Sequence, residues 1–387
     1  MRSIVACLVL LALTPGRLAA DNDRPDLKAL YDAHRWFELR ESVVKGTAPV
    51  FYQAAAACAF NDLPRCEKKL AHLIKSAART DDAIEAHRLL AASYFRQGKY
   101  REALTHVDAL LALRPQDSDV RDDRPVLAAL HNFGDQRVVR RASSSLQLQD
   151  AGLPIVINGV PGTYWFDTGA DLSALSESDA KRFGLRIVNA PIKEGDVTGA
   201  QVDSRITVAD ELSIGSVQLS HVAFLVFSDD QPPFDQLPAG SRVIGLPVLL
   251  ALQRFVWRAD KKFEIDPKSS PANLCFNGHS PIVQVQFENR YLALTLDTGS
   301  TNTDLYPPFA ELFPELIRTA SKTDSYKMEG LDGAKNMNAA ILSSLHMSIG
   351  AFPVILSPGK CPAHAHDGSQ QVFSRESRHR PPAATGT

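Results

Sequence analysis

The chain has 387 residues, of which 44% are hydrophobic and 22% are charged, and its formal net charge is −2. This composition excludes a fibrous or wholly disordered protein and leaves room for about two or three ordinary domains. The near balance of charge argues against a nucleic-acid partner, because no broad excess of basic residues is present to contact phosphates. Five cysteines are too few for a disulfide-built scaffold, so the fold must depend mainly on apolar burial.

The first residues have the pattern of an export signal. Arg2 precedes an apolar run over residues 4–13, and small residues lead up to Ala20. The run is shorter than the roughly 20 residues that a membrane-spanning helix needs. We therefore expect residues 1–20 to be a signal peptide and the protein to be periplasmic or secreted, with no membrane association after cleavage. An uncleaved N-terminal anchor is the alternative.

The cysteines beyond this segment would then lie in a compartment that permits disulfides. Cys58 and Cys66 are close enough in sequence to bridge two helices, and Cys275 and Cys361 could bridge two distant strands. Free buried thiols are an equal alternative for both pairs.

Residues 22–135 are expected to form an α-helical domain, because apolar residues recur there at helical spacing. The stretch 92–104, followed by Pro115, closely resembles a tetratricopeptide repeat, with Gly98 at the turn between two helices. A weaker copy has Asn61 at its turn. Such an array could dock a partner protein or a substrate peptide, or it could be a structural spacer.

Short alternating apolar runs after about residue 136 predict antiparallel strands. An apolar hairpin leads twice into a similar four-residue motif, Asp167-Thr168-Gly169-Ala170 and Asp297-Thr298-Gly299-Ser300. Further residues recur at equal distances after each aspartate: Leu175 and Leu305, Ala180 and Ala310, and Phe183 and Phe313. A single Asp-Thr-Gly is a weak signal, but this agreement indicates a duplicated unit.

The duplicated unit resembles the retropepsin-like aspartic proteases over residues 140–356. The resemblance implies two mainly-β lobes, lobe 1 over 140–268 and lobe 2 over 275–360, which face each other across a peptide-binding cleft. Val243-Ile244-Gly245 looks like the family's second signature, a strand that crosses beneath the catalytic loop. Hairpin flaps over the cleft are expected around Thr198, Gly199 and Gly330.

The family's chemistry needs a pair of carboxylates, here Asp167 and Asp297. Two carboxylates within hydrogen-bonding distance cannot both ionise, so they share one proton. The ionised member takes a proton from water while the protonated member hydrogen-bonds the scissile carbonyl, and no metal or cofactor is needed. The resemblance also implies that Thr168 and Thr298 cross-link the two loops, and that Ser300 could add a hydrogen bond to Asp297.

Lobe 2 lacks the second signature at the corresponding place. Near residue 380 the family's apolar pair and glycine are replaced by a stretch rich in arginine and proline. Residues 361–387 are expected to be a disordered tail. The strand beneath Asp297 is therefore expected to be absent, or supplied by another chain.

These features predict an exported aspartic endopeptidase that acts on a peptide or protein substrate. One alternative is a non-catalytic peptide-binding or scaffold protein with a degenerate second lobe. The other is a homodimeric protease with a symmetric pair of Asp167 carboxylates.

Overall fold

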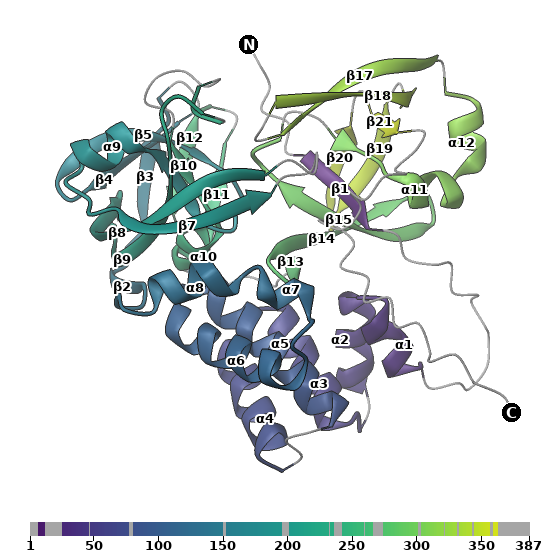
Figure 1. Ribbon diagram of the computed structural model, residues 1–387. Coiled ribbons are helices and arrows are strands. Elements are labelled where there is room, and N and C mark those ends of the chain that lie inside the picture. Colours follow the sequence, from purple (N-terminus) through teal and green to yellow (C-terminus); the bar gives the residue numbers. More distant parts are fainter. Residues whose placement is uncertain are drawn as a thin grey trace, which may run out of the picture.

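The computed structural model describes residues 7–11, 25–45, 47–76, 80–149, 152–195, 201–231, 233–235, 242–258, 260–265, 274–300, 303–320, 322–330, 333–342, 344–356 and 359–362. Helices fill the lower part of Figure 1, and two β-rich lobes lie side by side above them. Apart from the strand β1 (Cys7–Leu11), helices come first and strands follow, which confirms the predicted fold class.

The helical part contains α1 (Leu27–Asp32), α2 (Trp36–Lys45), α3 (Val50–Ala59), α4 (Leu63–Ser76), α5 (Asp81–Arg96), α6 (Tyr100–Leu113), α7 (Ser118–Arg121) and α8 (Arg124–Leu130). Gly98 turns the chain between α5 and α6 with φ +69°, and Asn61 does the same between α3 and α4 with φ +59°. Both lie in the left-handed region that glycine and asparagine adopt most easily. No described helix is both long and apolar enough to cross a membrane.

A disulfide joins Cys58 at the end of α3 to Cys66 in α4. Of the two alternatives for Cys275, the structure has the free buried thiol and not the bridge. Cys275 faces the helices, where it packs with Phe37 and Ala56, so its position on β13 serves packing rather than cross-linking.

Lobe 1 is built from β2 (Arg137–Arg140), β3 (Ser144–Gln147), β4 (Leu153–Ile157), β5 (Val160–Phe166), β6 (Ser173–Ser176), α9 (Glu177–Arg182), β7 (Val188–Gly195), β8 (Gln201–Ile214), β9 (Val217–Phe227), β10 (Val243–Ile244), α10 (Leu246–Leu252), β11 (Phe255–Trp257) and β12 (Lys262–Ile265). Its 8-stranded sheet has the order β2-β9-β6-β10-β5-β4-β8-β7, and β11-β12-β3 form a second sheet. The short strand β10 therefore lies between β5 and β6, as the second signature predicts.

Lobe 2 is built from β13 (Leu274–Asn277), β14 (Ser280–Phe287), β15 (Arg290–Asp297), β16 (Thr303–Asp304), α11 (Pro307–Leu312), α12 (Pro314–Arg318), β17 (Lys322–Gly330), β18 (Gly333–Leu342), β19 (Leu345–Ile349), β20 (Phe352–Leu356) and β21 (Gly359–Pro362). The strand β1 (Cys7–Leu11), from the other end of the chain, joins the sheet β1-β15-β14-β19-β20. The tail was predicted to begin at residue 361. That start is wrong, because β21 pairs with β18 through Pro362; residues 363–387 lie outside the described part.

The helices pack against both lobes. Leu127 and Leu130 of α8 share a hydrophobic cluster with Ile192 and Val202, which lie on the β7–β8 hairpin of lobe 1. A second cluster joins α2 and α3 to Cys275, Ile282 and Ala293 of lobe 2. The helical region is therefore a common base beneath the two lobes (Figure 1).

Candidate active site

Strand β5 delivers Asp167, and β10 fixes the backbone at that point. The Trp165 N–H donates to the Arg242 carbonyl (2.7 Å), and the Asp167 N–H donates to the Ile244 carbonyl (3.0 Å). Gly245 follows β10 and touches the loop after Asp167: an added Cβ would lie 2.4 Å from the Leu172 carbonyl carbon. Only glycine fits here without moving the backbone.

The two aspartate loops meet tip to tip. A Cβ added to Gly299 would lie 2.5 Å from the Asp167 carboxyl carbon, and one added to Gly169 would lie 2.8 Å from that of Asp297. Each carboxyl therefore rests against the glycine of the opposite loop. The structure brings Asp167 and Asp297 together within one chain.

Backbone N–H groups hold both carboxylates. The Gly169 N–H donates to Asp167 Oδ1 (2.8 Å), and the N–H groups of Gly299 (2.9 Å) and Ser300 (3.2 Å) donate to Asp297 Oδ1. Ser300 thus reaches Asp297 through its backbone N–H. Ala170 also donates its backbone N–H to Asp167, so the two motifs are more alike than their last residues suggest.

The two threonines cross-link the loops reciprocally. The Thr168 N–H donates to Thr298 Oγ1 (3.0 Å), and the Thr298 N–H donates to Thr168 Oγ1 (3.1 Å). Each hydroxyl then donates to the strand before the opposite aspartate, Thr168 to the Leu296 carbonyl (2.6 Å) and Thr298 to the Phe166 carbonyl (2.9 Å). Four hydrogen bonds therefore fix the two loops relative to each other.

Burial raises the pKa of Asp167 above its usual range, and the negative charge of Asp297 raises it further. The backbone N–H groups oppose this shift, but they do not cancel it. Because a second negative charge at this position is costly, the raised pKa of Asp167 favours a pair of carboxyls that shares one proton.

Two hairpins correspond to the predicted flaps. In lobe 1, β7 pairs with β8 up to Gly195 and Gln201, and Thr198 and Gly199 lie outside the described residues. In lobe 2, Gly330 lies opposite Gly333 at the end of the β17–β18 hairpin.

Glu194, on the lobe 1 hairpin, is a residue that sequence reasoning missed. Its pKa is raised to about 8 by burial and by the charges of Asp171, close to the catalytic motif, and Asp123, at the start of α8. The His279 Nε2 of lobe 2 lies 3.3 Å from Asp123 Oδ2. The β7–β8 hairpin, the helices and both lobes therefore meet at one point. The spacing of residues in the sequence could not reveal this junction.

Arg96, at the end of α5, joins the helices to lobe 2. Its guanidinium donates to the Gly278 carbonyl in the β13–β14 turn and to the Cys58 carbonyl (2.9 Å), and it lies 4.7 Å from the Phe276 ring centre. Arg96 is only 3% exposed, so these contacts replace its hydration.

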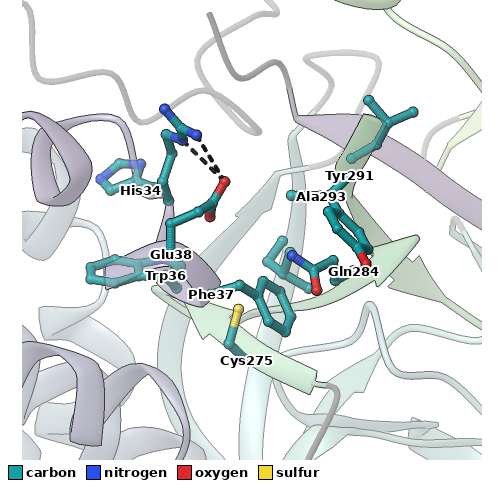
Figure 2. Close-up of a pocket in the computed structure, with 11 residues that line it drawn as sticks. His34, Trp36, Phe37, Glu38, Cys275, Gln284, Tyr291 and Ala293 are labelled. Carbon is teal, nitrogen blue, oxygen red and sulfur yellow. Dashed lines mark hydrogen bonds and ion pairs between the residues drawn. The ribbon is translucent and has the colours of Figure 1, made fainter. Parts of the chain in front are cut away.

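The cavity in Figure 2 lies at the same interface, between α2 and the strands β13, β14 and β15. It is lined by Trp36, Phe37, Cys275, Gln284 and Tyr291 among others, and its volume is about 10 Å³. This space is no larger than a single water needs. It is a packing gap and not a ligand site.

Comparison with known proteins agrees with this geometry. Residues 153–245 match the model of the aspartyl protease family. The predicted resemblance is confirmed. The matched segment runs from β4 through Asp167 to Gly245, and its elements build the first half of the site.

Among solved structures, the chain is similar to a retropepsin-like aspartic protease from Rickettsia conorii, with 15% identity over 34% of this chain and 94% of that chain. The TM-score is 0.23, which does not establish a common arrangement of the whole chain. No curated protein matches the chain.

Proposed function

We propose that the protein is an exported aspartic endopeptidase. The observation that carries this proposal is the pair of carboxyls, Asp167 and Asp297, each packed against the glycine of the other loop and held by the threonine cross-link. Two carboxyls in this arrangement can share one proton and hold a water between them. The intrachain pairing favours this reading over a symmetric dimer of Asp167 carboxylates.

In the proposed mechanism, Asp297 accepts a proton from the bound water, and the water oxygen attacks the scissile carbonyl carbon. Protonated Asp167 donates a hydrogen bond to the carbonyl oxygen and stabilises the charge of the tetrahedral intermediate. The proton taken by Asp297 then passes to the leaving amine as the C–N bond breaks. The pKa of Asp167, raised by burial, keeps the proton available for this role.

An extended peptide is the substrate that fits a site bordered by strand hairpins, because the edge of a hairpin offers backbone hydrogen bonds. The hairpins β7–β8 and β17–β18 are the proposed sources of those bonds. Side-chain preference would come from the residues around the aspartate loops.

The Cys58–Cys66 disulfide supports the proposed export, because disulfides persist in the periplasm and outside the cell. The composition of residues 1–20 supports the same localisation. A helical base that contacts both lobes favours a structural role for this region over recruitment of a partner.

Cleavage of a diverse peptide mixture from pH 3 to pH 8 tests the proposal. The variants Asp167→Asn and Asp297→Asn should each lower activity by at least about 10³-fold, while Asp260→Asn on an exposed turn should keep it. Activity that survives Asp297→Asn but not Asp167→Asn would indicate a symmetric dimer. A folded protein without activity at any pH would favour the peptide-binding alternative.

A further inference from the structure

The two lobes differ in the strand that lies beside the catalytic strand. In lobe 1, β10 lies between β5 and β6, and it runs parallel to β5. In lobe 2 the equivalent strands are β15 and β16, and β1 from the N-terminal end of the chain lies beside β15 and contacts β16. Figure 1 shows β1 against β15, next to α11. Residues 7–11 therefore take the place that β10 has in lobe 1.

The direction of β1 shows that it is not a copy of β10. It pairs antiparallel with β15 over its whole length, from Cys7 opposite Asp297 to Leu11 opposite Ala293. In lobe 1 the corresponding backbone N–H, that of Asp167, is satisfied by the parallel strand through Ile244. A reversed strand can satisfy the same edge, because both orientations offer alternating N–H and carbonyl groups.

The middle of strand β15 is buried in the structure. Leu292, Ala293, Leu294 and Thr295 are all buried, so both faces of the strand are covered. Leu294 packs inside lobe 2 and Ala293 packs on the helices. Backbone groups at a buried position are almost always hydrogen-bonded, because an unpaired group costs about 1–3 kcal/mol. With β1 in place, the backbone groups on this side of β15 have a partner strand.

We propose that the edge of β15 is an acceptor site for an apolar β-strand, and that its occupant is the chain's own N-terminal segment, residues 7–11. The apolar composition of this segment, Cys-Leu-Val-Leu-Leu, suits a strand that pairs with β15. The segment expected to direct export is then also a structural strand of lobe 2. Cleavage after Ala20 would remove it and expose the backbone next to Asp297.

Hydrogen exchange of the full chain tests this pairing. Successive N–H groups of a strand point to opposite sides, so one of the two variants Val9→Pro and Leu10→Pro removes an N–H that faces β15. In that variant we expect deuterium uptake of residues 290–297 to be about tenfold faster. The matched controls Val9→Thr and Leu10→Ile keep the N–H and should leave uptake unchanged. Uptake of residues 160–166, the equivalent strand of lobe 1, serves as the internal reference.

A cross-link tests the register without disturbing the fold. Val9 lies opposite Thr295, so the double variant Val9→Cys/Thr295→Cys should form a disulfide under mild oxidation, whereas Val9→Cys/Leu292→Cys should not. Equal uptake in the proline variants and their controls would overturn the proposal, as would equal cross-linking of the two cysteine pairs. All variants carry Asp167→Asn to prevent self-cleavage. Because neither readout needs catalysis, failure of the proposed protease activity would leave this result interpretable.

Discussion

The hydroxyl groups of Thr168 and Thr298 each accept the backbone N–H of the other residue, at 3.1 and 3.0 Å, and so tie the two aspartate loops into one unit. Their effect is on the alignment of Asp167 with Asp297.

Replacement of Thr168 by valine should therefore lower kcat much more than it changes KM. Valine keeps the shape but removes an acceptor and a donor, and we expect a loss of about 2–3 kcal/mol in the free energy of unfolding. Thr168→Ser retains the hydroxyl and should recover most of the activity. Steady-state kinetics and urea unfolding check both results. Equal kinetics for the valine and serine variants would show that the cross-link is dispensable.

The Asp167→Asn variant should be inactive and yet more stable than the original protein at neutral pH. A carboxyl whose pKa is raised on folding stabilises the native state while it is protonated. That stability is lost as the pH rises from the unfolded pKa through the raised folded pKa. We expect Asn to raise Tm by about 2–4 °C at pH 8 and to leave it nearly unchanged at pH 4. Thermal unfolding at both pH values measures the difference, and an equal shift at each would contradict it.

Glu194→Gln should reduce the dependence of stability on pH in the range from about 4.5 to about 8. The pKa of Glu194 is raised to about 8, so its ionisation beside Asp171 and Asp123 destabilises the folded state as the pH rises through this range. The variant should slow proteolytic nicking of the β7–β8 hairpin at pH 8 and have little effect at pH 4. Glu211→Gln, on an exposed part of β8, is the control.

Gly245→Ala should lower the free energy of unfolding of lobe 1 by about 1–3 kcal/mol. The added methyl group would overlap the backbone of Leu172. Gly134→Ala is a matched control, since its methyl group would meet the side chain of His221 at 3.0 Å, and a side chain can shift. Chemical denaturation of both variants gives the comparison. If the two lose equal stability, the close approach beneath the loop is not what requires glycine at 245.

Arg96→Met should cost about 2–4 kcal/mol in the free energy of unfolding, because the Gly278 and Cys58 carbonyls lose a buried donor. Arg101→Met, at an exposed site where the guanidinium also donates to carbonyls, should cost less than about 0.5 kcal/mol. Hydrogen exchange of residues 274–280 should quicken in the first variant alone. Unchanged exchange there would mean that Arg96 does not hold lobe 2 on the helices.

The sequence was sufficient for the parts that depend on local pattern. The order of helices and strands, the Gly98 and Asn61 turns, and the strand over Val243-Ile244 all follow from spacing and turn chemistry that neighbouring residues carry.

The sequence was insufficient where residues that are distant in the chain meet in the fold. The junction of Glu194, Asp123 and His279 joins three regions, and the pairing of β1 with β15 joins residues 7–11 to residues 290–297. An apolar run at the N-terminus has the same composition whether it directs export or completes a sheet. From the sequence alone, Cys275 could form a disulfide or pack as a free thiol. Its position in a buried cluster with Phe37 shows that it packs.

The helical base contacts both lobes and so limits how far one lobe can rotate against the other. Lobes joined only by a linker could rotate about a hinge, and their carboxyls would have to find their alignment again in every turnover. A shared base restricts that rotation. In the proposed reaction, the electrostatic environment of the two carboxyls would then be preorganised before substrate binds. Opening of the site would then fall to the hairpins rather than to the lobes.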